Sequence, residues 1–314
     1  MTVYILRRII EALVVVLIVS FLSFMMIHLI PGDPVIAVLG LEAKQAEIDA
    51  LRTQLLLDKP ISVQYGHWIS KFVRGEFGKS IITKENITSL IVKRLPVTAY
   101  IGLLSLFLSV LLGIPAGIIT AVRRGTFLDT VITSIANIGI SIPVFWLGIL
   151  GIYTFGLRLG WFPIQGYTSP FENFWLSLKQ IIMPVLCSSV AFLAVLVRQT
   201  RSSMLEVIRQ DYIRTAFSKG LKEGLIVRRH ALKNCLIPIV TLLGLHIRVL
   251  IGGSVLIETV FNIPGIGRLL VGAVFDKDFV VVQIVSVVIA LIVTLTNLVV
   301  DISYGWLDPK IRYE

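Results

Sequence analysis

Charged side chains are scarce in this sequence of 314 residues. Asp, Glu, Lys and Arg make up 15% of it, against about a quarter of an ordinary soluble domain. Hydrophobic residues make up 56%, and the mean hydropathy is +0.89. This composition argues against a soluble protein and predicts a chain in lipid, where only helices or closed barrels satisfy the backbone. Residues 280–300 are almost uniformly apolar rather than alternating, so we expect an all-α polytopic membrane protein.

Residues that support metal, redox or nucleophilic chemistry are also few. Cys187 and Cys235 form no CxxC pair, and the four histidines form no HExxH pattern. Residues 75–80, Gly-Glu-Phe-Gly-Lys-Ser, lack the spacing of a phosphate-binding Walker A loop, because Val73 stands where that loop needs glycine. No Gly-x-Ser-x-Gly elbow is present. We therefore expect no metal site, no cofactor bound by this chain and no enzyme active site.

The net charge of +10 raises the question of nucleic-acid binding. No module that combines aromatic and basic residues is visible, and basic residues gather in the loops of membrane proteins for another reason, the positive-inside bias. We expect a lipid environment and no nucleic acid.

Six uncharged or weakly charged stretches are long enough to cross a bilayer: residues 12–30, 97–122, 130–157, 180–197, 234–261 and 279–300. Stretch 234–261 is the weakest, because it carries His246, Arg248 and Glu258, and a charge near a helix centre costs about 2.5 to 3.5 kcal/mol. Stretch 12–30 resembles a signal peptide but is too long and has no cleavage pattern, so we interpret it as an uncleaved anchor.

Basic residues predict the orientation of these six helices. The short segments on the side of both termini carry fifteen Lys and Arg residues, whereas the short loops on the other side carry only Arg158, Lys179, Arg268 and Lys277. The positive-inside rule therefore predicts that both termini are cytoplasmic.

The sequence suggests two parts. Residues 1–95 comprise the anchor and an external module, in which apolar residues recur at helical spacing between Ala43 and Leu57. Residues 96–314 comprise a five-helix core with a cytoplasmic loop at 198–235. Gly113 and Gly117 form a GxxxG pattern, which predicts close helix packing, with dimerisation as the alternative.

A short separate helix is predicted in the cytoplasmic loop from Asp211 to Lys219. Asp211 suits an N-cap, Lys219 favours a helix C-terminus, and Gly220 suits the left-handed residue that ends a helix. Exposed aromatic and basic side chains on such a helix would contact a cytoplasmic partner. The alternative is an amphipathic helix resting on anionic headgroups.

This loop resembles the EAA loop of ABC importer permeases, in the form typical of the dipeptide, oligopeptide and nickel group. The resemblance extends to Ile30–Pro34, Gly75–Ser80 and Glu258–Leu270. Arg214-Thr215-Ala216 stands where the general pattern has Glu-Ala-Ala, so the role of the loop transfers but individual contacts do not.

The resemblance implies a type I ABC importer permease fold in the cytoplasmic membrane of a prokaryote. It implies a second homologous permease as partner, two cytoplasmic ATPase subunits that use ATP and Mg, and an external substrate-binding protein. It also implies that the loop helix couples the chain to the ATPase, through Asp211, Tyr212, Arg214, Thr215, Ala216, Phe217, Lys219 and Gly220.

Two further groups of residues are candidates for function. At 100° per residue, one face of stretch 234–261 carries Thr241, Arg248, Gly252 and Thr259, which would line the substrate path or contact the partner permease; we favour the path. Near the external end, Glu258 would order the following loop. That loop, with Asn262, Pro264, Gly265 and Gly267, would receive the binding protein, close the helix with its glycines supplying backbone freedom, or do both.

Peptide is the expected substrate class, because no cluster of His or Cys favours a nickel or other metal chelate. A stand-alone secondary transporter is a further alternative, but it would need intramembrane acid pairs or a similar device for energy coupling, and the sequence has few intramembrane charges.

Overall fold

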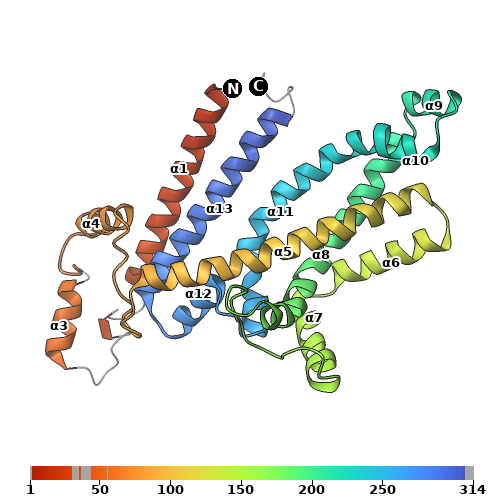
Figure 1. Cartoon of the computed structure of the whole chain (residues 1–314). Coiled ribbons are helices and arrows are strands. Elements are labelled where there is room, and N and C mark those ends of the chain that lie inside the picture. Colours follow the sequence, from red (N-terminus) through yellow and green to blue (C-terminus); the bar gives the residue numbers. More distant parts are fainter. Residues whose placement is uncertain (1, 30–34, 37–43, 55, 308–314) are drawn as a thin grey trace. The chain divides into compact units, whose positions relative to one another are not determined.

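The computed structural model describes residues 2–29, 35–36, 44–54 and 56–307, and these residues are almost wholly helical (Figure 1). Within these ranges the nearest approach to a β-strand is one isolated antiparallel bridge between Lys79 and Asn86. The expected all-α fold is therefore confirmed.

The chain forms two compact units. The first comprises residues 1–97 and 265–314, and the second comprises residues 98–264. The C-terminal helix thus belongs with the N-terminal part, a grouping that the division at residue 95 does not include.

The first unit is built on α1 (Thr2–Met25) and α13 (Phe279–Leu307), which lie side by side (Figure 1). Arg8 approaches Asp301 at 3.4 Å near one end of the pair. Near the other end, the buried Gln283 side chain donates to the Phe24 carbonyl at 2.9 Å, just before the short 3-10 helix η1 (Met26–Leu29). These contacts fix the two helices antiparallel, so the N-terminus of α1 and the C-terminus of α13 lie at the same end.

The described part of the segment after η1 contains two helices, α3 (Gln45–Gln54) and α4 (Ile61–Val73). The helical spacing between Ala43 and Leu57 predicts the first of them, whereas the second was not predicted. On α4 the rings of Trp68 and Phe72 stack with centroids 5.6 Å apart, and the Phe72 ring lies 5.2 Å from that of Phe77, which follows the helix. Such contacts stabilise a small module beyond the area that they bury.

The second unit contains most of α5 (Ile87–Val122), which begins in the first unit. It also contains a set of packed helices: α6 (Phe127–Ser141), α7 (Val144–Gly151) with the π-helix η2 (Ile152–Arg158), α8 (Phe174–Ile208), α9 (Asp211–Ser218), α10 (Glu223–Leu225) with the π-helix η3 (Ile226–Ala231), and α11 (Leu232–Val260).

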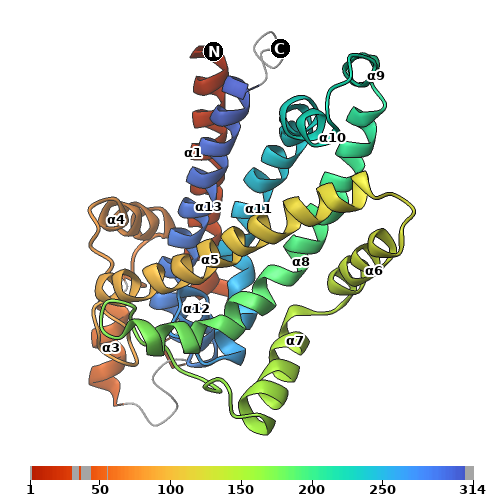
Figure 2. The same ribbon diagram turned by 45° about the vertical axis from the view of Figure 1, so that its right-hand side comes forward.

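Four helices in the described part are long and apolar enough to cross a membrane, and the number rises to six if each of two bent helix pairs is one span. The predicted span 130–157 is not one straight helix, because α6 and α7 meet at a bend of 102° (Figure 2). Ile142 has an extended backbone before Pro143. Proline lacks an N–H and disfavours helix at the preceding residue, which explains the break.

The GxxxG glycines of α5 pack against α8 within the chain. A Cβ built on Gly113 would lie 2.9 Å from Leu196 Cβ, and one built on Gly117 would lie 2.5 Å from Thr200 Cβ. Both distances are too short for any side chain, so the glycines allow the two helices to approach closely. Close packing, the first of the two interpretations, is confirmed.

Candidate functional site

The loop helix α9 has the predicted position but a different N-terminus. Gln210 is its N-cap and makes no side-chain cap, whereas the expected cap, Asp211, lies in the first turn, where a carboxylate suits the helix dipole. Asp211 also lies 3.7 Å from Arg214. At the other end Lys219 is the C-cap residue, and Gly220 has a φ of +75°, so the prediction of a left-handed glycine after the helix is correct.

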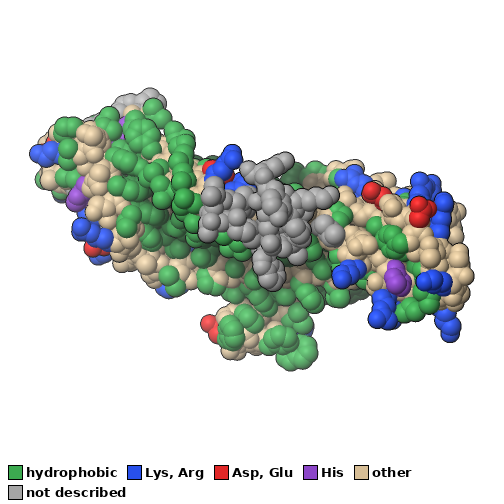
Figure 3. All heavy atoms as spheres, turned by 90° about the horizontal axis from the view of Figure 1, so that it is seen from above, with side chains coloured by type: hydrophobic (Ala, Val, Ile, Leu, Met, Phe, Trp, Pro, Cys, Tyr) green, Lys and Arg blue, Asp and Glu red, His purple; other side chains and the backbone are tan. Residues whose placement is uncertain are grey.

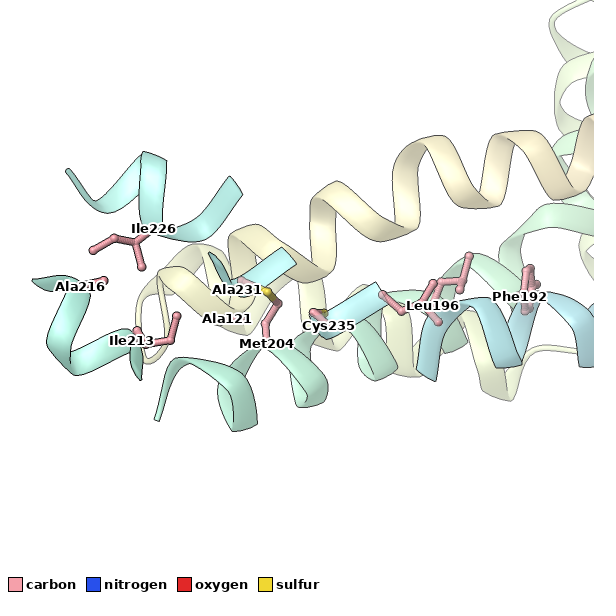
Figure 4. Packing of buried hydrophobic residues seen from close by; sticks show 10 residues of the cluster. Ala121, Phe192, Leu196, Met204, Ile213, Ala216, Ile226, Ala231 and Cys235 are labelled. Atoms are coloured by element: carbon pink, nitrogen blue, oxygen red, sulfur yellow. The ribbon is translucent and has the colours of Figure 1, made fainter. Parts of the chain in front are cut away.

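The inner face of α9 is packed into its own chain. Ile213 is fully buried and Ala216 is nearly so, and both face Ile226 of η3 (Figure 4). Burial of a side chain such as Ile213 contributes about 2 kcal/mol. The same cluster includes Met204 of α8 and Cys235 of α11, so α9 is anchored to both long helices. Ala216 belongs to this anchor and not to the surface.

The outer face of α9 presents aromatic and basic groups to solvent. Tyr212 and Phe217 are 42% and 48% exposed, and Arg214, Thr215 and Lys219 are also exposed. The Tyr212 hydroxyl accepts a hydrogen bond from Asn234 Nδ2 at 2.7 Å, which ties it to α11. Seen from above, Lys and Arg side chains gather at the end of the second unit that carries α9 and α10 (Figure 3). A short anchored helix with an exposed aromatic and basic face is suited to a protein contact.

The predicted path residues are only partly described. Thr241 and Thr259 are exposed on α11, and Thr259 donates to the Val255 carbonyl one turn earlier at 2.8 Å. The side chain of Arg248 and the surroundings of Gly252 are outside what the structure describes. Whether the four share a water-lined face therefore stays a prediction.

Glu258 is fully buried near the end of α11. It accepts a hydrogen bond from Thr98 Oγ1 at 2.6 Å. Its main-chain carbonyl accepts from Ile263 N–H at 2.8 Å, which closes the end of the helix. The side chain thus fixes α11 against the start of the second unit, where a buried carboxylate needs such a partner.

The turn after α11 differs from the expectation that its glycines supply backbone freedom. Asn262 is the left-handed residue, with a φ of +55°, and its Nδ2 donates to Gln165 Oε1 at 3.1 Å. Gly265 has an extended backbone that any residue adopts, and Gly267 lies inside α12 (Ile266–Phe275). The glycine interpretation is wrong, because the left-handed residue of this turn is Asn262 and not a glycine. Asn tolerates this conformation. Pro264 precedes Gly265 and ends the turn.

The segment Gly75–Ser80 contributes to a buried polar cluster within the first unit. Ser80 Oγ donates to Asp278 Oδ2, and the backbone N–H groups of Ile81 and Val281 lie 3.3 Å from Asp278 Oδ1. Asp278 is thereby both the N-cap of α13 and the anchor of the turn after Ser80. This role of Asp278 was not predicted, although an Asp directly before an apolar run is an N-cap signal.

Among the residues that the structure describes, no three His, Cys, Asp or Glu side chains come together as metal ligands. We therefore find no group there that would hold a metal ion.

Two family descriptions together match nearly the whole chain. Residues 113–313 match the binding-protein-dependent transport system inner membrane component, and residues 1–102 match the N-terminal part of such membrane components.

Relatives match over the same full length. The chain is 41% identical to the probable peptide ABC transporter permease protein y4tP of Sinorhizobium fredii, over 100% of both chains. It is 40% identical to the glutathione transport system permease protein GsiC of Escherichia coli, over 99% of both.

Solved structures support the same fold. A chain of the inward-facing MetNI methionine ABC transporter matches with a TM-score of 0.59 and 21% identity, covering 71% of this chain and 99% of that one. A chain of an amino acid ABC transporter matches with a TM-score of 0.52 and 14% identity, covering 69% and 93%. The exposed helix α9, the apolar spans and these full-length matches agree: the chain belongs to the family of binding-protein-dependent transport system inner membrane components, and it is a multi-pass permease subunit of an ABC importer.

Proposed function

We propose that this chain translocates peptides as one of two homologous permease subunits, with six membrane spans and both termini in the cytoplasm. Two cytoplasmic ATPase subunits and an external substrate-binding protein complete the importer. Peptide is the substrate class because the relatives with full-length matches are named as permeases for peptides and for glutathione, itself a peptide. ATP and Mg are bound by the ATPase subunits and not by this chain.

The observation that carries the proposal is the two-faced packing of α9. Its buried face joins α9 to α8 and α11 through Ile213 and Ala216, while Tyr212 and Phe217 remain exposed. A partner that binds the exposed face and moves therefore displaces two long helices with it, because the apolar core that joins them resists deformation. Closure of the ATPase pair would then shift the permease between conformations through the difference in its contacts with each.

The translocation path is proposed to follow the face of α11 with Thr241, Arg248, Gly252 and Thr259. The outer surface, comprising the segment before residue 95 and the turn that contains Asn262 and Pro264, is proposed to receive the binding protein.

Reconstitution tests the proposal. The complete importer in vesicles should accumulate a labelled dipeptide only with ATP and the loaded binding protein, and the permease should co-purify with the ATPase pair. Accumulation by this chain alone would instead identify a secondary transporter. If the cognate binding protein retains a nickel chelate and no peptide, the metal-chelate alternative is correct.

A further inference from the structure

A basic cleft lies between α6 and α8 in the second unit. Its volume is about 760 Å³. Four arginines line it: Arg124 in the turn before α6, Arg198 and Arg201 on α8, and Arg209 at the end of α8. They outnumber the two lining or adjoining carboxylates, Asp129 and Glu206, by two. The cleft therefore favours an anion.

Only one of the four arginines has a partner in the described part of the chain. Arg201 Nε and Nη2 each donate to the buried Asp129 carboxylate at 2.9 Å, in a bidentate pair. Gly125 N–H and Thr133 Oγ1 donate to the same carboxylate. Asp129 is thus fully occupied. The guanidinium groups of Arg124, Arg198 and Arg209 are exposed and make no hydrogen bond or ion pair to any described residue. Free guanidinium groups recognise carboxylates and other planar anions.

One side of α6 is polar, and it includes Thr133 and Asn137, which line the cleft. At 3.6 residues per turn, Thr130, Thr133, Ser134, Asn137 and Ser141 fall within an arc of about 100°. Ile135 lies on the opposite side and is 64% exposed. A span that carries hydroxyl and amide groups on one side and apolar groups on the other faces water with the first and lipid with the second. The cleft therefore continues into a hydrophilic surface and not into an apolar groove for acyl chains.

We infer that this cleft is an anion site at the cytoplasmic mouth of the translocation path, where Arg198 and Arg209, with Arg124, hold the C-terminal carboxylate of a peptide before release. The inference rests on the proposed function and adds α6 to the path. The cleft also contains Gln210, the N-cap of α9, so the bound carboxylate lies next to the coupling helix. The positive charge attracts the peptide electrostatically, which raises the rate of transfer more than the affinity.

Uptake by the reconstituted importer tests the charge. We expect Arg198→Gln with Arg209→Gln to lower the maximal rate of Ala-Glu uptake by about fivefold, the factor for about 1 kcal/mol from exposed charge pairs. Uptake of Ala-Lys should fall less, and the concentration for half-maximal uptake, set by the binding protein, should not change. The matched control is Arg123→Gln, because Arg123 adjoins Arg124 but lines a different cleft. An equal loss in the control, or no loss in the double variant, would overturn the inference. If the wild-type importer transports no peptide at all, the proposed function itself fails.

Thiol labelling tests the water-lined face without transport. In a variant without Cys187 and Cys235, Asn137→Cys should react with a membrane-impermeant maleimide added from the cytoplasmic side of inverted vesicles. Ile135→Cys, on the opposite face of the same helix, should not react. Equal reactivity of the two positions, or reaction of Ile135→Cys alone, would show that α6 does not border the path.

Discussion

Gly220 ends α9 with a φ of +75°, and a Cβ built on it would meet no atom within 4 Å. The cost of a substitution there comes from the backbone alone, at about 1 to 2 kcal/mol for a left-handed L-residue. We expect Gly220→Ala to insert normally but to lose most of the ATPase stimulation by the loaded binding protein, whereas Gly220→Asn should retain it, because Asn tolerates this conformation.

Gly224 supplies the control for this prediction. It lacks a positive φ and also has open space around a built Cβ, so Gly224→Ala should leave stimulation unchanged. Equal stimulation in Gly220→Ala and the wild type would show that the end of α9 does not determine coupling.

The pair of Asp129 and Arg201 gives a second prediction for individual residues. The side chain of Asp129 is 7% exposed and that of Arg201 is 27% exposed. Arg201→Met leaves a buried carboxylate without its cation and should cost on the order of 3 kcal/mol. Asp129→Asn should cost less, because Arg201 reaches water. Thermal unfolding of the purified protein in detergent should place the double variant above Arg201→Met; additive losses would contradict the pairing.

Among the helices, some could be predicted from sequence patterns and others could not. Runs of apolar residues predict where long helices lie, because a helix needs about twenty such residues to cross the bilayer. They do not show that one run contains two helices, and the sharp bend at Pro143 was missed although proline itself was the signal. The apolar helix α12 was missed for a related reason, since ten residues are too few to cross a membrane and it follows a Pro-Gly turn.

Close packing of α5 against α8 leads to a prediction for these elements. Gly117→Ala forces a Cβ to within 2.8 Å of the Val197 carbonyl, and overpacking of this kind costs about 1 to 3 kcal/mol. The apparent unfolding temperature in detergent should fall. Gly272→Ala is the control, because a Cβ on this helical glycine of α12 would meet nothing within 4 Å; an equal decrease in both variants would refute the explanation by close packing.

At the scale of the whole molecule, the proposed topology places α9 and the α7–α8 loop on opposite sides of the membrane. In a cysteine-free background expressed without ATPase subunits, Phe171→Cys should react with an impermeant maleimide in spheroplasts, since Phe171 is 99% exposed in that loop. Ser218→Cys on α9 should react only in inverted vesicles. Labelling of Ser218→Cys in spheroplasts would reverse the orientation and remove the basis for coupling.

The position of the loop helix and the left-handed glycine that ends it could be predicted from the sequence, because helix-ending residues are local signals. The burial of Ala216 could not, because it depends on Ile226, which only the folded loop brings near. The contact between Asp278 and Ser80 could not be predicted either, because the two residues are 198 positions apart in the sequence.

That long-range bond has a consequence for how such permeases can be recombined. A chimaera that takes its first hundred residues from one relative and its last forty from another inherits Ser80 and Asp278 from different parents. If one parent lacks Ser80, the hybrid has a buried carboxylate short of a donor, and if the other lacks Asp278, the buried Ser80 hydroxyl loses its acceptor. We therefore expect an exchange of outer segments to succeed only if Ser80 and Asp278 come from the same parent.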